Sequence, residues 1–451
     1  MQGYPSVDLR ALLVSYGFPP VGGAGVQRVV KLAKYLPHHG VWPAVLTASN
    51  PNVPVHDASL LRDLPRGVEV ERARTLEPRV ASKRGTWPQP TPSRCSWPRS
   101  LAARSLRALS GLASDALFPD PQVLWQPAAL SALAHRLAAA QDDAVLVSGP
   151  PFSQFLLAPL ARAGRIGVVL DYGEEWRTIR SVYEMRRSRL ARTLGDPLEA
   201  TLLRRAHAVV TATDEFRDNL LARFPFVDPG RVFAIPNGYD PEDFPDPLPA
   251  PPSDRLVITH AGTVFSMTSA RGLLDAIRLL HSRSPQIARS LRVRFVGRIV
   301  DTELDAFDGT DALGVERAGY VPHDDVLSEL AASHGTLCLL DDVPGAESVH
   351  PAKIFELMRL GRPILTLAPP GALARLVERH GLGPAVHPRD DQAIAAALEA
   401  AVRRFRKTGG ARATWRKTPG IERYDRRALA GEFADILKEA AERTRCRSCF
   451  S

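Results

Sequence analysis

Short apolar runs alternate with segments of helical spacing along most of the chain, and this alternation most constrains the fold. Residues 11–15 have the pattern of a short buried strand, and residues 26–36 follow with apolar side chains at helical spacing. Strands and helices that alternate in this way predict a parallel sheet with helices on both faces. In the first half the expected strands are residues 11–15, 43–47, 67–71, 144–148, 167–171 and 208–212.

The pattern breaks once, in a stretch rich in Pro and Asp over residues 236–252, which has the composition of a linker. A second strand–helix series follows it, and 451 residues exceed what one ordinary core holds. We therefore predict an α/β fold with domains at residues 1–238 and 239–425, and a C-terminal helix in residues 426–451. In the second series the expected strands are residues 255–260, 293–297, 336–340 and 363–366.

Composition excludes several classes of protein. No run reaches the roughly 18 apolar residues of a membrane-spanning helix, and the N-terminus does not have the pattern of a secretory signal. Four cysteines, one of them Cys338, are too few and too scattered for a disulfide framework. We expect a cytoplasmic protein.

The formal net charge of +9 is concentrated locally. Residues 80–112 contain six basic and no acidic side chains, interleaved with Trp87 and Trp97, and residues 177–205 form a second basic stretch. Basic residues beside tryptophan favour an anionic membrane surface or a polyanionic substrate, although a solvated loop and a charged helix face explain them equally well. No nucleic-acid-binding motif accompanies the charge. We expect peripheral contact with the anionic inner membrane surface, and no nucleic-acid partner.

A glycine-rich turn follows the first expected strand of the first domain. Gly22, Gly23 and Gly25 lie between that strand and a helix. Glycines let backbone approach a ligand, and a helix N-terminus presents N–H groups to an anion. The spacing is not the dinucleotide-binding G-x-G-x-x-G, so a merely tight turn is the alternative interpretation.

The second domain repeats this arrangement. Gly262 and Thr263 follow its first strand, Arg271 enters the next helix, and Arg298 ends the second strand. Ligands of open α/β sheets bind beyond the carboxyl ends of the strands. Backbone N–H groups and arginines there suit a diphosphate, although a single arginine after a strand is more often an ordinary surface residue.

Lys353 and Glu356 are three residues apart near the start of an expected helix, so they share a face. A carboxylate at Glu356 can accept hydrogen bonds from two ribose hydroxyls, while Lys353 faces phosphate. An ordinary surface Lys–Glu pair is the alternative interpretation.

Blocks of sequence across nearly the whole chain resemble the GT-B glycosyltransferases of family 4, in that family's order. The resemblance implies two facing Rossmann-like domains with parallel sheets and an interdomain cleft, with the donor held mainly by the second domain. It also implies retaining transfer without a metal, and a final helix that crosses back onto the first domain. The blocks are residues 15–31, 43–47, 149–153, 171–176, 235–240, 351–356 and 361–364.

The resemblance also implies roles for individual residues. Asp171 and Glu174, in a D-x-x-[DE]-x-W block, belong to the acceptor side, where they either orient acceptor hydroxyls or anchor loops. The catalytic residues implied are Arg271, Lys353 and Glu356, and the donor-binding residues are Gly22, Gly23, Gly25, Gly262, Thr263, Arg298, Glu347 and Ser348.

One position departs from the family pattern. The family often has two glutamates separated by seven residues; Glu356 matches the second, and the first falls on Ser348 with Glu347 beside it. Either a shift in register brings Glu347 into the role, or Ser348 and the backbone hold the donor sugar.

We therefore expect a hexosyltransferase-like enzyme that moves a sugar, with retention, from a nucleotide-sugar to a carbohydrate or glycolipid acceptor in cell-surface polysaccharide or glycolipid synthesis. The nucleotide-sugar is a substrate, and no cofactor or metal is expected. The alternatives are a natural-product glycosyltransferase, a sugar-nucleotide epimerase, and a catalytically silent GT-B scaffold.

Overall fold

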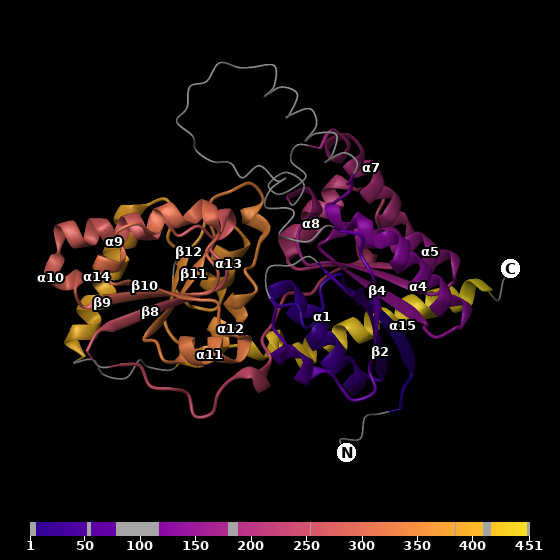
Figure 1. Ribbon diagram of the computed structural model, residues 1–451, viewed down its shortest axis with the longest axis horizontal. Coiled ribbons are helices and arrows are strands. Elements are labelled where there is room, and N and C mark those ends of the chain that lie inside the picture. The colour runs from indigo at the N-terminus through magenta and orange to yellow at the C-terminus, as the bar shows by residue number, and fades with distance from the viewer. Residues whose placement is uncertain are drawn as a thin grey trace. The chain divides into compact units, whose positions relative to one another are not determined.

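The computed structural model describes residues 6–51, 56–77, 117–178, 188–252, 254–383, 385–408 and 416–448. The chain forms two compact units (Figure 1): unit 1 is Met1–Ile235 with Arg427–Ser451, and unit 2 is Pro236–Arg426. The whole basic segment 80–112 lies outside the described residues, as does part of the segment 177–205.

Unit 1 is built on a parallel sheet in the order β3-β2-β1-β4-β5-β6-β7. Its central strands are buried along their whole length, as expected where helices cover both faces. The last strand was not predicted, because three residues are too few for a periodic pattern. The strands are β1 (Leu9–Val14), β2 (Val41–Ala48), β3 (Glu69–Ala73), β4 (Ala144–Gly149), β5 (Gly167–Tyr172), β6 (Ala208–Thr211) and β7 (Val232–Ala234).

Helices pack on both faces of this sheet. On one face lie α4 (Gln126–Ala138), α5 (Ala158–Ala163), α7 (Arg189–Arg205) and α8 (Asp214–Arg223). On the other face lie α1 (Ala24–Tyr35) and α15 (Arg426–Ser448), which pack Tyr35, Phe433 and Leu437 into one core. Figure 1 shows α15 running beside α1. The helix lies so close to β5 that a Cβ at Gly167 would be 2.8 Å from the Ala440 carbonyl carbon.

Unit 2 contains a smaller parallel sheet in the order β10-β9-β8-β11-β12. The strands are β8 (Leu256–Ala261), β9 (Leu291–Val296), β10 (Val315–Gly319), β11 (Gly335–Leu339) and β12 (Ile364–Leu367). The helices are α9 (Arg271–Arg283), α10 (Pro285–Ala288), α11 (His323–Ala331), α12 (Lys353–Leu360), α13 (Ala372–Arg379) and α14 (Asp391–Lys407). One face is covered by α9 and α14, and the other by α11, α12 and α13.

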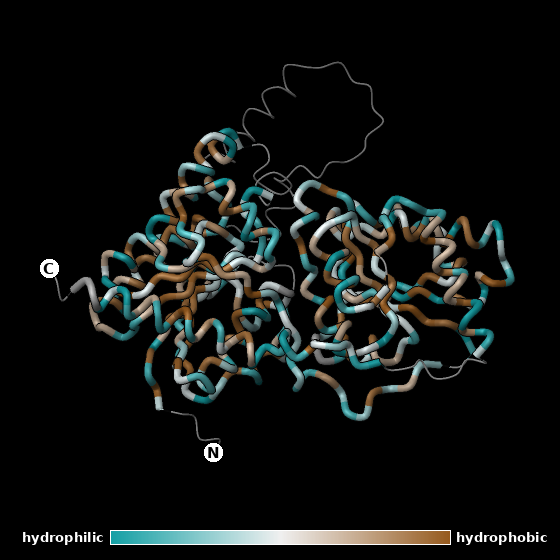
Figure 2. Tube along the Cα trace, turned by 180° about the vertical axis from the view of Figure 1, so that it is seen from behind, coloured by the Kyte–Doolittle hydropathy of each residue, from teal (hydrophilic) through white to brown (hydrophobic). Residues whose placement is uncertain are grey.

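Hydrophobic segments run through the middle of each unit and hydrophilic ones lie around them (Figure 2). Among the described residues, no helix combines the length and apolar character that a membrane crossing requires. Where the chain enters and leaves unit 2, the Tyr239 N–H donates to the Tyr424 carbonyl at 3.0 Å, and the Arg426 N–H donates to the Tyr239 carbonyl at 3.0 Å.

Strand order reverses once in each sheet. In unit 1 the chain moves outward from β1 to β3 and then returns to the other side of β1 as β4; unit 2 does the same at β8 and β11. The loops after such neighbouring strands diverge and leave a crevice, where ligands of open α/β sheets bind. The fold therefore assigns one crevice to each unit, after β1 and β4 and after β8 and β11.

Candidate functional site

Two glycine turns pack against each other at the carboxyl edge of the unit 2 sheet. Gly262 follows β8 with a φ of +149°, and Gly297 follows β9 with a φ of +137°. A Cβ at Gly297 would lie 2.2 Å from the Gly262 carbonyl oxygen, so no side chain fits there. The Val264 N–H donates to the Arg298 carbonyl at 2.8 Å, and the side chains of Thr263 and Arg298 are exposed. The turn after β8 therefore presents backbone at the crevice.

Arg271 begins α9 and is held by two carboxylates. Its Nη2 lies 2.5 Å from Asp305 Oδ1 and its Nε 3.5 Å from Glu303 Oε2, while 45% of its side chain is exposed. The hydrogen bond that Arg271 donates to Asp305 raises the pKa of Arg271 and lowers the pKa of Asp305. A phosphate at the N-terminus of α9 would therefore meet a guanidinium that is already oriented, and would compete with these carboxylates for it.

Lys353 and Glu356 lie on one face at the start of α12, which confirms the prediction from their spacing. Lys353 Nζ is 2.8 Å from Glu356 Oε2, and only 5% of the Glu356 side chain is exposed. Because α12 follows β11, its N-terminus lies on the carboxyl side of the sheet. A nearly buried carboxylate distinguishes this pair from the ordinary surface pair.

Glu347 and Ser348 stand where the family pattern often has its first glutamate, and the two differ in exposure. Glu347 and Ser348 lie in a short helical turn, Ala346–Ser348, after β11. The Glu347 side chain is exposed and Ser348 is buried. A Cβ at Gly371, just after β12, would lie 2.7 Å from Glu347 Cα, so two loops at the carboxyl edge pack together here.

The unit 1 glycines lie beside open space. Gly23 precedes α1 with a φ of +121°, and no side chain caps this helix. No described atom lies within 4 Å of a Cβ built on Gly23 or Gly25, and Gly22 is only partly buried. Backbone at the N-terminus of α1 is therefore accessible to a ligand, in the crevice after β1.

Asp171 is the next-to-last residue of β5, and its carboxylate is engaged inside unit 1. Arg28 donates to it from Nε at 2.9 Å and from Nη2 at 2.8 Å, and Ser148 Oγ donates at 2.7 Å. Arg28 also donates to the Ile235 carbonyl at 3.0 Å. Of the two interpretations of Asp171, these bonds favour the anchor over a contact with acceptor hydroxyls. Glu174 is exposed. Desolvation of its carboxyl group by the surrounding protein disfavours the ionised form and raises its pKa.

Sequence reasoning missed Arg28 and His260. Arg28 is buried in α1 next to the buried Lys31, and its spacing in the sequence does not reveal its partner. His260 is buried in β8; its ring Nδ1 lies 3.3 Å from the Leu337 carbonyl oxygen of β11, and burial lowers its pKa to about 4. The ring is therefore neutral at physiological pH, directly beneath the Gly262 turn.

Comparison with known protein families finds a match in the first half of the chain. Residues 21–243 match Glycosyltransferase Family 4. No curated protein matches the chain in sequence.

Solved structures match over nearly the whole chain. The Anabaena protein Alr3699/HepE, crystallised with UDP and glucose, matches 96% of this chain and 100% of its own with a TM-score of 0.61 at 14% identity. WaaG, a glycosyltransferase involved in lipopolysaccharide biosynthesis, matches 96% of this chain and 98% of its own with a TM-score of 0.55 at 13% identity. A putative UDP-N-acetylglucosamine 2-epimerase from Listeria monocytogenes matches 97% of this chain and 98% of its own with a TM-score of 0.53 at 12% identity. Likeness at such identities shows the fold, which is GT-B: two Rossmann-like domains.

Proposed function

We propose that the chain is a GT-B glycosyltransferase that transfers a sugar from a nucleotide-sugar to a carbohydrate or lipid-linked acceptor. The match of residues 21–243 to Glycosyltransferase Family 4 and the GT-B fold support this proposal. One observation carries the choice of donor. The Lys353–Glu356 pair stands at the N-terminus of α12, on the edge of the unit 2 sheet where the Gly262 turn presents backbone. An ammonium group and a nearly buried carboxylate on one face match the diphosphate and the ribose of such a donor.

The remaining donor contacts follow from charge. Lys353 and Arg271 neutralise the diphosphate, Glu356 accepts from the ribose hydroxyls, and the Gly262–Thr263 backbone donates to phosphate oxygens. We assign Arg298, Glu347 and Ser348 to recognition of the donor sugar, and the glycines Gly22, Gly23 and Gly25 to donor binding through their backbone. Because Lys353 and Arg271 neutralise the leaving diphosphate, we propose no metal and no cofactor.

The proposed reaction retains the configuration at the anomeric carbon. The acceptor hydroxyl oxygen bonds to that carbon on the face from which the diphosphate leaves, while the carbon–oxygen bond to the diphosphate breaks. The hydroxyl proton passes to an oxygen of the departing phosphate. The protein then contributes chiefly by positioning the substrates and by stabilising charge on the leaving group.

Two of the structural neighbours support a narrower proposal. A structure holding UDP and glucose, and a protein of lipopolysaccharide biosynthesis, favour a UDP-hexose donor and a role in cell-surface polysaccharide or glycolipid synthesis. A lipid-linked acceptor places the enzyme in the cytoplasm at the inner membrane surface, with the basic residues 80–112 as the contact. Purified protein should then bind anionic vesicles at low salt, and failure to bind them would remove the membrane contact alone.

Calorimetric titration with nucleoside diphosphates and nucleotide-sugars tests the donor site. We expect one nucleoside diphosphate to bind the native protein, and Glu356→Gln to weaken that binding about tenfold or more through the lost ribose contacts. Glu399→Gln, which removes a partly exposed carboxylate on α14 that pairs with Arg403, is the matched control and should bind like the native protein. If no nucleotide binds the native protein, the proposed donor site is wrong.

Three alternatives differ in the reaction product. With sugar acceptors, lipid-linked acceptors and small natural products offered in parallel, the acceptor that is glycosylated separates the proposed function from a natural-product glycosyltransferase. An epimerase, favoured only by its shared fold, would convert UDP-N-acetylglucosamine without any acceptor. A silent scaffold would bind the nucleotide and would glycosylate none of the acceptors.

A further inference from the structure

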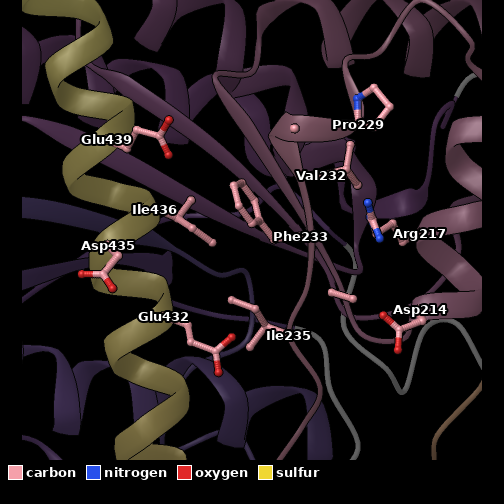
Figure 3. A pocket seen from close by; sticks show the side chains of 12 residues that line it. Asp214, Arg217, Pro229, Val232, Phe233, Ile235, Glu432, Asp435, Ile436 and Glu439 are labelled. Atoms are coloured by element: carbon pink, nitrogen blue, oxygen red, sulfur yellow. The ribbon is translucent and has the colours of Figure 1, made fainter.

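Unit 1 contains a cavity beside the open edge of its sheet. β7 is the last strand in the sheet order, and next to it lies a cavity of about 530 Å³ between β7, α8 and α15 (Figure 3). None of the predicted donor or acceptor residues lines this cavity. It is therefore separate from the proposed transferase site.

The backbone of β7 has hydrogen-bonding groups that face away from its neighbour. The Ile235 N–H donates to the Thr211 carbonyl of β6 at 2.9 Å, and Ala234 pairs in register with Thr211. In a parallel pair, alternate residues direct both backbone groups to the same neighbour. Ala234 therefore directs its N–H and C=O outward, as edge strands do.

Apolar side chains form the inner surface of the cavity. Phe233 of β7 and Ile436 of α15 point toward each other across it (Figure 3), and Ile436 is buried. Such a surface suits the methylene chain of a lysine or arginine side chain, whose charged end reaches water or a carboxylate.

Carboxylates surround this apolar surface. Glu432, Asp435 and Glu439 stand on one face of α15, and Asp214 of α8 lies on the other side of the cavity (Figure 3). Among the lining residues Arg217 is the single cation, and Arg443 bonds to Glu439 at 2.5 Å. In a chain of net charge +9, this locally negative groove is complementary to a basic partner.

The spacing of these groups matches an extended strand. The seven residue steps of helix from Glu432 to Glu439 span about 10 Å, and alternate residues of a strand lie about 7 Å apart on one side. Two basic side chains of an extended segment therefore fit along the row of carboxylates while the backbone of that segment lies beside Ala234.

We propose that this groove binds an extended basic segment of a partner protein, which adds a strand to β7 and places its lysine or arginine side chains against α15. The backbone of the segment exchanges hydrogen bonds with Ala234, and its basic side chains lie over Phe233 and Ile436 to reach Asp435 and Glu439. Main-chain bonds supply affinity in this mode of recognition, and alternate side chains supply specificity.

Fluorescence anisotropy with labelled peptides tests the proposal on the full-length protein. The probe Lys-Val-Lys-Val-Lys-Val should bind at low salt and weaken as salt screens the charges, whereas Glu-Val-Glu-Val-Glu-Val should not bind. Reversing two charges with Asp435→Lys and Glu439→Lys together should weaken binding at least about tenfold. Glu399→Lys on α14, the matched control, should leave it unchanged.

A backbone-modified probe separates strand addition from charge attraction alone. Two methylated versions of the lysine peptide, one on the valine nitrogens and one on the lysine backbone nitrogens, keep its charge. Because alternate residues of a strand direct their N–H groups to the same side, one of the two lacks the donors that face β7, and its binding should fall at least about fivefold. Undiminished binding of both methylated peptides, or binding of spermidine at the same site with the peptide's affinity, would overturn the proposal, as would equal binding of the two unmodified peptides. Nucleotide binding is measured on the same samples, so failure here is distinct from failure of the transferase function.

Discussion

Arg28 and Asp171 form an ion pair inside unit 1, with Arg28 Nη2 2.8 Å from Asp171 Oδ1 and side chains that are 7% and 0% exposed. The pair joins α1 to the end of β5, and Ser148 adds the end of β4 through its hydroxyl. Three elements around the unit 1 crevice are therefore held by one carboxylate, and Asp171 acts there by positioning them.

Replacing Asp171 with Ala is expected to lower the free energy of unfolding by about 3–5 kcal/mol, because it leaves the Arg28 guanidinium buried without its carboxylate. Urea denaturation measures this loss. The double variant Arg28→Met with Asp171→Leu removes both charges and should recover much of the stability. Glu174→Gln, at an exposed position, is the control. Native stability of Asp171→Ala with lost acceptor turnover would instead assign Asp171 to the acceptor.

Replacing Arg271 with Met is expected to weaken nucleoside diphosphate binding about tenfold, because one charge-assisted contact to phosphate is lost. Its melting temperature should stay close to the native value, since the contacts with Asp305 and Glu303 involve a half-exposed side chain. Calorimetric titration and thermal melting measure the two effects on the same samples. Arg271→Lys keeps the charge and should recover part of the affinity; a variant with native affinity would exclude Arg271 from the site.

A Gly297→Ala substitution is expected to destabilise unit 2 by roughly 3 kcal/mol or more, because its Cβ would meet the Gly262 carbonyl oxygen in addition to occupying a left-handed conformation. Gly309→Ala is the matched control: Gly309 also has a positive φ, but no described atom lies within 4 Å of its Cβ. That control should cost about 1 kcal/mol. Equal losses in urea denaturation would show that the two glycine turns do not pack as described.

His260 is expected to make the stability of unit 2 depend on pH. Burial lowers its pKa from 6.5 to about 4, so between these values the unfolded chain binds a proton that the folded chain does not. Stability therefore falls as the pH drops from about 6.5 to about 4, by an amount on the order of 3 kcal/mol.

Urea denaturation of the native protein and of His260→Gln across this range measures the effect. The variant should lose much of the pH dependence, whereas His135→Gln, at an exposed histidine of α4, should keep it. Identical pH profiles for the native protein and His260→Gln would contradict the assignment.

Most of the fold could be predicted because strands buried on both faces are continuous apolar runs, and such runs are visible in the sequence. β4 and β5 correspond to the residues expected from their apolar pattern. β7 and β10 escaped prediction because they are edge strands of three and five residues. A short edge strand is only partly buried, so its sequence shows no clear alternation.

The sequence predicts the geometry of the candidate site only where residues close together in the chain form it. Lys353 and Glu356 lie three residues apart on one helix, so the helical period alone brings them together. The predicted residues Asp171 and Arg271 are different, because their charged partners lie 143 and 34 residues away along the chain. Nothing in the spacing of either residue reveals that partner.

The sequence by itself determined the two α/β series, the glycine turns after β1 and β8, and the shared face of Lys353 and Glu356, because apolar periodicity and short spacing are local properties of a chain. Only the tertiary structure decided which strands form the edges and which charges are buried in pairs. It placed Arg28 against Asp171, His260 beneath Gly262 and the carboxylates of α15 beside β7. These relationships depend on the packing of distant segments, which removes a charge from water and gives it a partner.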